Sequence, residues 1–131
     1  MARTQMATSI LVVDDDPDVR EGLCDLLVEE GFSVASAANG ADALDQLRQP
    51  CLPDVVLLDL RMPKMDGYEF LKCRQADEKL RDVPVIVVSA TPELQGLQFP
   101  VWATLVKPLD FHLLLDLLNE EAPRTVLPTR G

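Results

Sequence analysis

The chain has 131 residues, of which 47% are hydrophobic and 26% are charged, and we expect one globular domain with its own core. Asp and Glu number 22 against 12 Lys and Arg, so the formal net charge is −10, which argues against binding to nucleic acid or anionic lipid. No apolar run approaches the roughly 20 residues of a membrane span. The three cysteines lack the pairing of a disulfide framework or a zinc site, and we expect free thiols in a cytoplasmic protein.

The first strand and the first helix have clear sequence signals. Residues 1–8 show no signal-peptide pattern and are expected to form a flexible leader, and the apolar run at residues 10–13 (ILVV) predicts a strand. Asp16 and Pro17 are suited to the start of a helix, and Gly31 follows its expected end. The apolar residues of this helix have the spacing of one apolar stripe: Val19, Leu23, Leu26 and Leu27.

The middle of the chain repeats this alternation of strand and helix. Residues 32–36 are a weaker strand candidate whose mixed pattern favours the edge of a sheet, and a short helix is expected after them. Residues 55–58 (VVLL) and 85–88 (VIVV) are uniformly apolar, as is typical of parallel strands buried on both faces. Between these two strands we expect a helix that begins at about Asp66.

The last third of the chain contains a short helix candidate, a strand and a final helix. Only residues 92–98 are available for the helix that should follow the fourth strand. Residues 103–106 predict the fifth strand, and Asp110 opens a helix with a strong apolar stripe. Residues 122–131 hold two prolines and two arginines and are expected to form a flexible tail, which leaves residues 9–121 as the domain.

Polar side chains follow the predicted strands at their C-terminal ends. Residues 14–16 are all Asp, and Asp59, Ser89 and Lys107 follow three later strands. The alternation predicts an α/β fold with a doubly wound parallel sheet of five strands, in which these ends share one edge and form one cleft. Carboxylates this close repel one another unless a cation joins them, and oxygen ligands favour Mg²⁺. A neighbouring hydroxyl and ammonium group would suit a phosphoryl group carried by a carboxylate.

Each of these residues also has an ordinary structural explanation. Asp16 can cap a helix, Asp59 or Ser89 alone can begin a turn, and Lys107 can be a surface lysine. A cap needs only one carboxylate, however, and the combination of groups at four strand ends favours a functional site. The chain has no glycine-rich phosphate loop, which argues against a nucleotide ligand.

The chain resembles the receiver domain of two-component response regulators in four segments: ILVVDDDPDVRE, DVVLLDLRMPKMDGYEF, PVIVVSA and LVKPL. The paired aspartates, the D-x-x-M-P-x-M-D-G loop, the hydroxyl and the Lys-Pro pair are specific in combination, although each alone is a weak signal. The resemblance extends over residues 9–121. It implies the flavodoxin-like (CheY-like) strand order 2-1-3-4-5 and a cis peptide bond between Lys107 and Pro108.

The resemblance also implies a role for each polar residue at the strand ends. Asp59 would be the phosphoacceptor, Ser89 the switch hydroxyl, and Lys107 the residue that pairs with the phosphoryl group. Asp15 would bind Mg²⁺ directly, and Asp14 would bind it through water. The complete set of implied metal ligands consists of three carboxylates and one backbone carbonyl, from Asp14, Asp15, Asp59 and Arg61.

The implied function is a phosphorylation-dependent signalling switch rather than an enzyme that releases a product. A histidine kinase or a phosphotransfer protein would be the donor, and a downstream output protein is a further expected partner. The phosphoryl group would add a charge of about −1.5 to −2 and bias a two-state rearrangement. We hypothesise that the side chain of Arg61 hinders the attacking water and slows loss of the phosphoryl group.

Two departures from the family pattern motivate an alternative function, a receiver-like adaptor that binds partners without phosphorylation. The segment between Ser89 and Lys107 is several residues shorter than is usual in the family, and Thr104 stands at the position of the aromatic switch residue. A phosphatase of the haloacid dehalogenase type is a third possibility. It is disfavoured because Arg61 occupies the position of the second acid in those enzymes, and because a cap domain does not fit in this length.

Overall fold

The computed structural model describes residues 8–49, 52–60, 67–89 and 101–119 of the chain. Within these residues, five strands and four helices follow one another as β1 (Ser9–Val13), α1 (Pro17–Glu29), β2 (Ser33–Ala37), α2 (Gly40–Leu47), β3 (Val55–Asp59), α3 (Gly67–Ala76), β4 (Val85–Ser89), β5 (Ala103–Val106) and α4 (Phe111–Asn119). The helix expected at residues 92–98 lies outside the described residues, as do nearly all of the expected leader and tail. None of the described helices has the length and apolar character of a membrane span.

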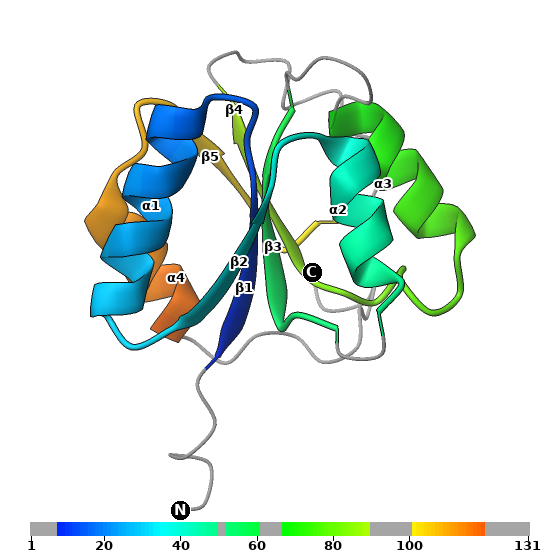
Figure 1. Ribbon diagram of the computed structural model, residues 1–131, viewed down its shortest axis with the longest axis horizontal. Helices are drawn as coiled ribbons and strands as arrows, with labels where there is room; N and C mark the ends of the chain where they lie inside the picture. Colours follow the sequence, from blue (N-terminus) through cyan, green and yellow to red (C-terminus); the bar gives the residue numbers. More distant parts are fainter. Residues whose placement is uncertain (1–7, 50–51, 61–66, 90–100, 120–131) are drawn as a thin grey trace, which may run out of the picture.

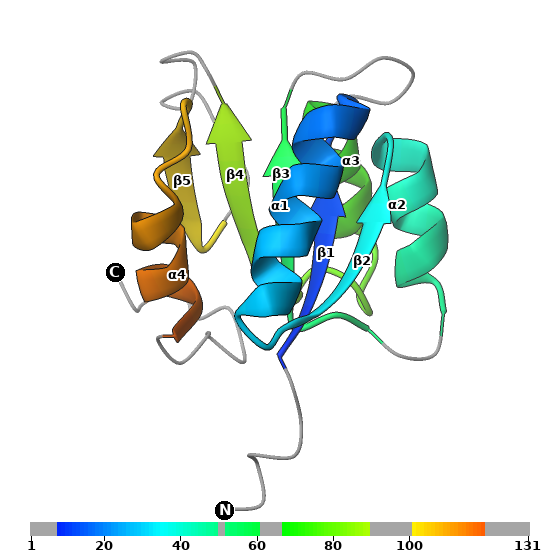
Figure 2. The same ribbon diagram turned by 60° about the vertical axis from the view of Figure 1, so that its left-hand side comes forward.

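The five strands form one parallel sheet with the order β2-β1-β3-β4-β5. This confirms the predicted fold class, the strand order and the edge position of β2 (Figure 2). Every residue of β3 and β4 is buried, whereas β2 buries only its last residue. The difference follows from composition, because β3 and β4 are almost wholly apolar and β2 has the small, mixed sequence SVASA.

Two hydrophobic layers hold the helices to the sheet. Helices α1 and α4 cover one face and helices α2 and α3 cover the other (Figure 1). Successive residues of β1 point to opposite faces, so Ile10 and Val12 pack in the layer under α1 and α4, and Leu11 and Val13 pack in the layer under α2 and α3. The sheet therefore has a covered core on both sides, as the uniformly apolar strands predicted.

Helix α1 begins as its sequence predicted. The side chain of Asp16 accepts hydrogen bonds from the backbone N–H groups of Asp18 and Val19, and Pro17 occupies the first turn. Gly31, just beyond the helix, has a positive φ of 98°, a conformation that glycine adopts without steric cost.

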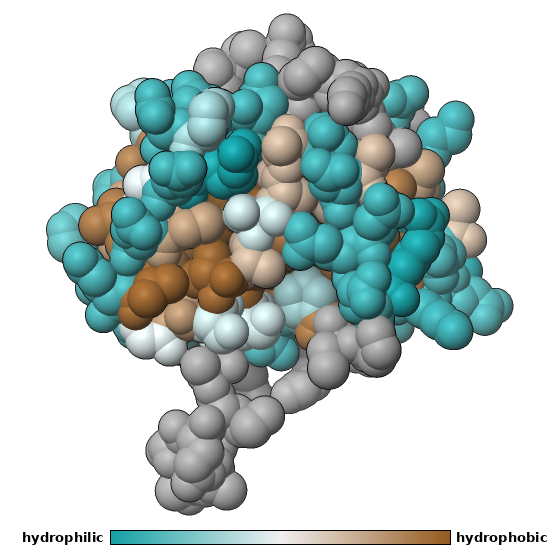
Figure 3. Space-filling view, in the orientation of Figure 1, coloured by the Kyte–Doolittle hydropathy of each residue, from teal (hydrophilic) through white to brown (hydrophobic). Residues whose placement is uncertain are grey.

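The predicted apolar stripe of α1 is only partly buried. Leu27 is fully buried and Leu23 is half-buried, but Val19 and Leu26 are 47% and 45% exposed. The helix buries a narrow face that includes Cys24, and the two exposed residues lie on the flank of that face. Figure 3 shows apolar surface on the α1 side of the molecule and a mainly hydrophilic surface over α2 and α3.

The C-terminal ends of the strands lie at one edge of the sheet (Figure 2). Asp59 and Ser89, which the sequence placed just after their strands, are the last residues of β3 and β4. They lie in neighbouring strands, because β3 pairs with β4 and Asp59 is in register with Val88. The fold thus delivers these polar groups to the same edge as the residues that follow β1 and β5.

Candidate functional site

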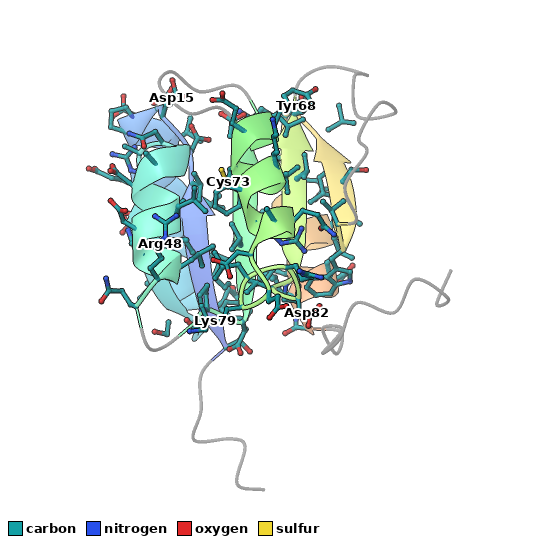
Figure 4. The ribbon with its side chains drawn as sticks, turned by 90° about the vertical axis from the view of Figure 1, so that its right-hand side faces the viewer. Asp15, Arg48, Tyr68, Cys73, Lys79 and Asp82 are labelled. Carbon is teal, nitrogen blue, oxygen red and sulfur yellow. The ribbon has the colours of Figure 1, made fainter. Side chains whose placement is uncertain are left out.

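Three carboxylates meet at the C-terminal edge of the sheet. Asp14, Asp15 and Asp59 each place one carboxylate oxygen within 4.8 Å of the others. Asp14 and Asp59 are buried, with 6% of each residue exposed, whereas Asp15 is exposed. Figure 4 shows Asp15 at this edge, at the opposite end of the molecule from Lys79 and Asp82. Three carboxylates with one open side could hold a metal ion with oxygen ligands.

Lys107 brings a positive charge to this cluster. Its Nζ lies 3.4 Å from Oδ2 of Asp59 and 3.9 Å from Oδ2 of Asp14. The peptide bond between Lys107 and Pro108 is cis, as the resemblance implied. Among the described residues, one ammonium group against three carboxylates leaves the site with an excess of negative charge, which a divalent cation would offset.

Burial makes the ionised form of Asp14 less favourable. It raises the pKa of Asp14, and the neighbouring charges of Asp59 and Asp15 raise it further. The N–H of Asp16 and the charge of Lys107 act in the opposite direction. An apolar cavity of about 210 Å³ adjoins the two buried aspartates, and its walls include Val12, Leu57 and Val88. The carboxylates therefore face a low-polarity wall on one side, where an ionised group is poorly solvated.

Ser89 is linked to Lys107 through the backbone. The Lys107 N–H donates to the Ser89 carbonyl oxygen at 2.9 Å, and Ser89 is in register with Val106 across β4 and β5. Ser89 is 1% exposed. It ends the strand that lies between the strand of Asp59 and the strand that leads to Lys107.

The turn between β1 and α1 is held by three hydrogen bonds around Asp14. Its N–H donates to the Ala37 carbonyl at 3.2 Å, and its Oδ1 accepts from the Asp16 N–H at 2.9 Å. Its own carbonyl accepts from Nη1 of Arg20 at 2.7 Å. We did not predict a site role for Arg20 from the sequence, because a hydrogen bond from a side chain to a backbone carbonyl is not marked by any hydrophobic periodicity or motif in the sequence.

The structure thus brings four of the predicted site residues together, namely Asp14, Asp15, Asp59 and Lys107. The fifth, Ser89, lies at the end of the adjacent strand. The predicted role of the Arg61 carbonyl lies outside the described residues. Thr104, at the position where the family has an aromatic residue, is exposed on β5.

Comparison with known proteins gives close relatives over most of the chain. The chain is 40% identical over 107 residues to the response regulator Rre1 of Synechocystis, and this match covers 78% of the chain and 46% of that protein. It is 35% identical over 107 residues to the phosphate regulon transcriptional regulatory protein PhoB of Escherichia coli, which covers 79% and 46% of the two chains. The chain therefore spans about half the length of these curated relatives.

Solved structures with the same fold include the response regulator TrrA of Thermotoga maritima in complex with Mg²⁺-BeF. Its TM-score is 0.76 at 31% identity, over 88% of this chain and 98% of that one. The receiver domain of a sensor histidine kinase from Pseudomonas aeruginosa, described with a magnesium ion in its active site cleft, has a TM-score of 0.76 at 32% identity, over 86% and 95%. The family model for the response regulator receiver domain matches residues 10–119. The chain belongs to the family of response regulator receiver domains.

Proposed function

We propose that this domain is a phosphorylation-dependent signalling switch that accepts a phosphoryl group on Asp59 in the presence of Mg²⁺. The observation that carries the proposal is the arrangement at the sheet edge, where three carboxylates lie within 4.8 Å of one another and Lys107 Nζ lies 3.4 Å from Asp59. The magnesium complexes described for the Thermotoga maritima and Pseudomonas aeruginosa proteins support Mg²⁺ as the metal. The phosphoryl donor would be a histidine kinase or a phosphotransfer protein.

The carboxylates fit Mg²⁺ because it prefers oxygen ligands and keeps several of its waters. Asp15 and Asp59 would bind it directly, Asp14 would bind it through water, and the backbone carbonyl of Arg61 would complete the protein ligands. The bound ion would supply positive charge where the phosphoryl oxygens meet the carboxylates. The buried position of Asp14 and Asp59 excludes competing solvent from their inner side.

In the proposed transfer, a carboxylate oxygen of Asp59 attacks the phosphorus atom of a phosphohistidine. The phosphorus–nitrogen bond breaks, and the imidazole leaves with the electron pair of that bond. Lys107 pairs with one phosphoryl oxygen, since its ammonium group already lies beside Asp59. The Ser89 hydroxyl donates a hydrogen bond to another phosphoryl oxygen.

The product is a changed protein surface rather than a released molecule. Phosphorylation replaces the single negative charge of the Asp59 carboxylate with a phosphoryl group that carries a charge of about −1.5 to −2. Its new contacts with Lys107 and Ser89 favour one of two conformations of the domain, and an output protein would recognise that conformation. The domain would therefore be a phosphoacceptor that assists its own phosphorylation and dephosphorylation, and not an enzyme that turns over a separate substrate.

We also propose the bounds of the domain and its location in the cell. The signalling unit would comprise residues 9–121. Its net charge of −10 disfavours contact with nucleic acid or an anionic membrane by this domain. A cytoplasmic location suits the free thiols of Cys24 and Cys73.

A phosphorylation assay tests the proposal. The protein is incubated with Mg²⁺ and a small phosphodonor such as phosphoramidate, and its intact mass is measured. We expect a gain of one phosphoryl group that is lost in Asp59→Asn and retained in the control variant Asp45→Asn, which changes an exposed carboxylate on α2. A folded wild-type protein that gains no phosphoryl group would contradict the proposal and would favour the adaptor function instead.

A further inference from the structure

Both peptide groups that flank Asp15 are held by hydrogen bonds. On one side, the carbonyl of the Asp14–Asp15 peptide accepts from Arg20 Nη1 at 2.7 Å. On the other side, the N–H of the Asp15–Asp16 peptide donates to Asp14 Oδ1 at 2.9 Å. Asp15 itself is exposed, so packing around its side chain does not set its direction. The two peptide planes therefore set the direction in which the side chain of Asp15 leaves the backbone, and Arg20 holds one of them.

Arg20 is anchored well enough to hold this plane. It lies in α1 just after the capped start of the helix, and its own N–H donates to the Asp16 carbonyl at 2.9 Å. The guanidinium group stays charged near neutral pH, and a charged donor makes a stronger hydrogen bond than a neutral one. The side chain is half-buried, and it borders a polar hollow between α1 and α2 that is also lined by Ala37 and Asp42.

Arg20 differs from Lys107 in its relation to the acidic cluster. Lys107 is within ion-pair distance of two of the carboxylates. Among the described residues, by contrast, the ion pairs do not include Arg20, and its guanidinium contacts the backbone carbonyl of Asp14 instead. This geometry indicates a role in orientation rather than in charge neutralisation.

We infer that Arg20 is a positioning residue for the metal site, which orients Asp15 toward the metal through the Asp14–Asp15 peptide. The inference rests on the proposed function, because it concerns Mg²⁺ bound by Asp15. Residues that orient a metal ligand without touching the metal typically change metal affinity by about 10-fold to 100-fold when they are replaced. A cation that acted only through its charge would have the opposite effect, since its removal would strengthen binding of a second cation.

Calorimetric titration with Mg²⁺ separates these two effects. Arg20→Met keeps the apolar stem of the side chain but removes the donor and the charge, and we expect it to weaken Mg²⁺ binding by about tenfold. Arg20→Lys restores a charged donor, and its affinity should return to within about threefold of wild type. Arg48→Met removes the same charge from an exposed position at the C-cap of α2 and should leave the affinity unchanged.

The outcomes are distinguishable. If the wild-type protein binds Mg²⁺ and Arg20→Met binds it equally or more tightly, the inference about Arg20 is overturned and the proposed function stands. No Mg²⁺ uptake by folded wild type contradicts both. The Tm of each metal-free variant is measured in parallel, since a purely structural role would lower Tm without a specific loss of affinity. If Arg20→Met does not fold, Arg20→Gln replaces it with the same expected loss, because the shorter amide does not reach the Asp14 carbonyl.

Discussion

Gly67 and Leu60 are in close backbone contact at the start of α3. The N–H of Gly67 donates to the carbonyl of Leu60 at 2.9 Å. A Cβ atom on Gly67 would lie 2.6 Å from the Cα of Leu60 and 2.8 Å from the carbonyl oxygen of Asp59. The backbone of α3 therefore sits directly against the strand end that carries the proposed phosphoacceptor, at a distance that only glycine allows.

We expect Gly67→Ala to destabilise the protein by about 1–3 kcal/mol, because the extra methyl group meets backbone atoms that cannot rotate away. Urea unfolding measures this change. Gly22→Ala is the matched control, since a Cβ at that position in α1 meets nothing within 4 Å, and it should stabilise the protein by up to about 1 kcal/mol. Similar effects of the two substitutions would show that the contact at Gly67 is unimportant.

Asp14→Asn should raise the Tm of the metal-free protein near neutral pH by a few degrees. Burial raises the pKa of Asp14 above its ordinary value of 3.8, so the folded protein disfavours the ionised carboxyl. The stability that this group contributes is complete below pH 3.8 and is lost as the pH rises through its folded pKa. The Tm values of wild type and Asp14→Asn should therefore be similar in acid, and the difference between them should grow as the pH increases.

Thermal melts from pH 3 upward, with and without Mg²⁺, check this prediction. Mg²⁺ should stabilise wild type more than Asp14→Asn, because only wild type carries the extra buried charge. Asp45→Asn, which alters an exposed carboxylate 75% open to solvent, should follow the wild-type curve. A metal-free Asp14→Asn protein that is less stable than wild type at neutral pH would refute the electrostatic explanation.

Arg74→Ala should destabilise the protein by at least about 2 kcal/mol. Arg74 is 1% exposed, and its Nε donates to the Val83 carbonyl at 3.0 Å, which joins the last turn of α3 to the segment before β4. Burial lowers its pKa to about 10, a shift that the charge of Asp82 opposes, so the group remains charged at neutral pH. Chemical unfolding should show a much smaller loss for Arg48→Ala, whose exposed pair with Asp45 contributes little.

Arg61→Asn should shorten the lifetime of the phosphorylated protein. The prediction follows from sequence, since Arg61 stands two positions after the proposed acceptor and lies outside the described residues. A smaller side chain would leave more room for the attacking water. The time course of phosphoryl loss after removal of the donor measures the effect, and an unchanged or longer lifetime would contradict the hypothesis about Arg61.

The sequence predicted the features that depend on repeating patterns. Buried runs such as residues 55–58 identified central strands, and the mixed pattern of residues 32–36 identified an edge strand. The convergence of Asp14, Asp59 and Lys107 followed from the rule that parallel strands end at one edge of a sheet. No side-chain contact had to be known for any of these predictions.

Features that depend on individual contacts were not predictable in this way. The exposure of Val19 and Leu26 depends on how much of α1 the neighbouring elements cover, which a helical period does not specify. The hydrogen bond from Arg20 to the Asp14 carbonyl and the close approach at Gly67 involve backbone atoms, which every residue type shares. Such contacts are visible only once the chain is folded.

The hydrogen bond from the Lys107 N–H to the Ser89 carbonyl has a mechanical consequence. It extends the β4–β5 pairing by one step beyond the register of Ser89 with Val106. Sliding of β5 along β4 would displace the lysine relative to the serine and break this bond. While the bond persists, the backbone ends of the two strands move as one unit, so a shift of the Lys107 backbone is passed on to the backbone of Ser89.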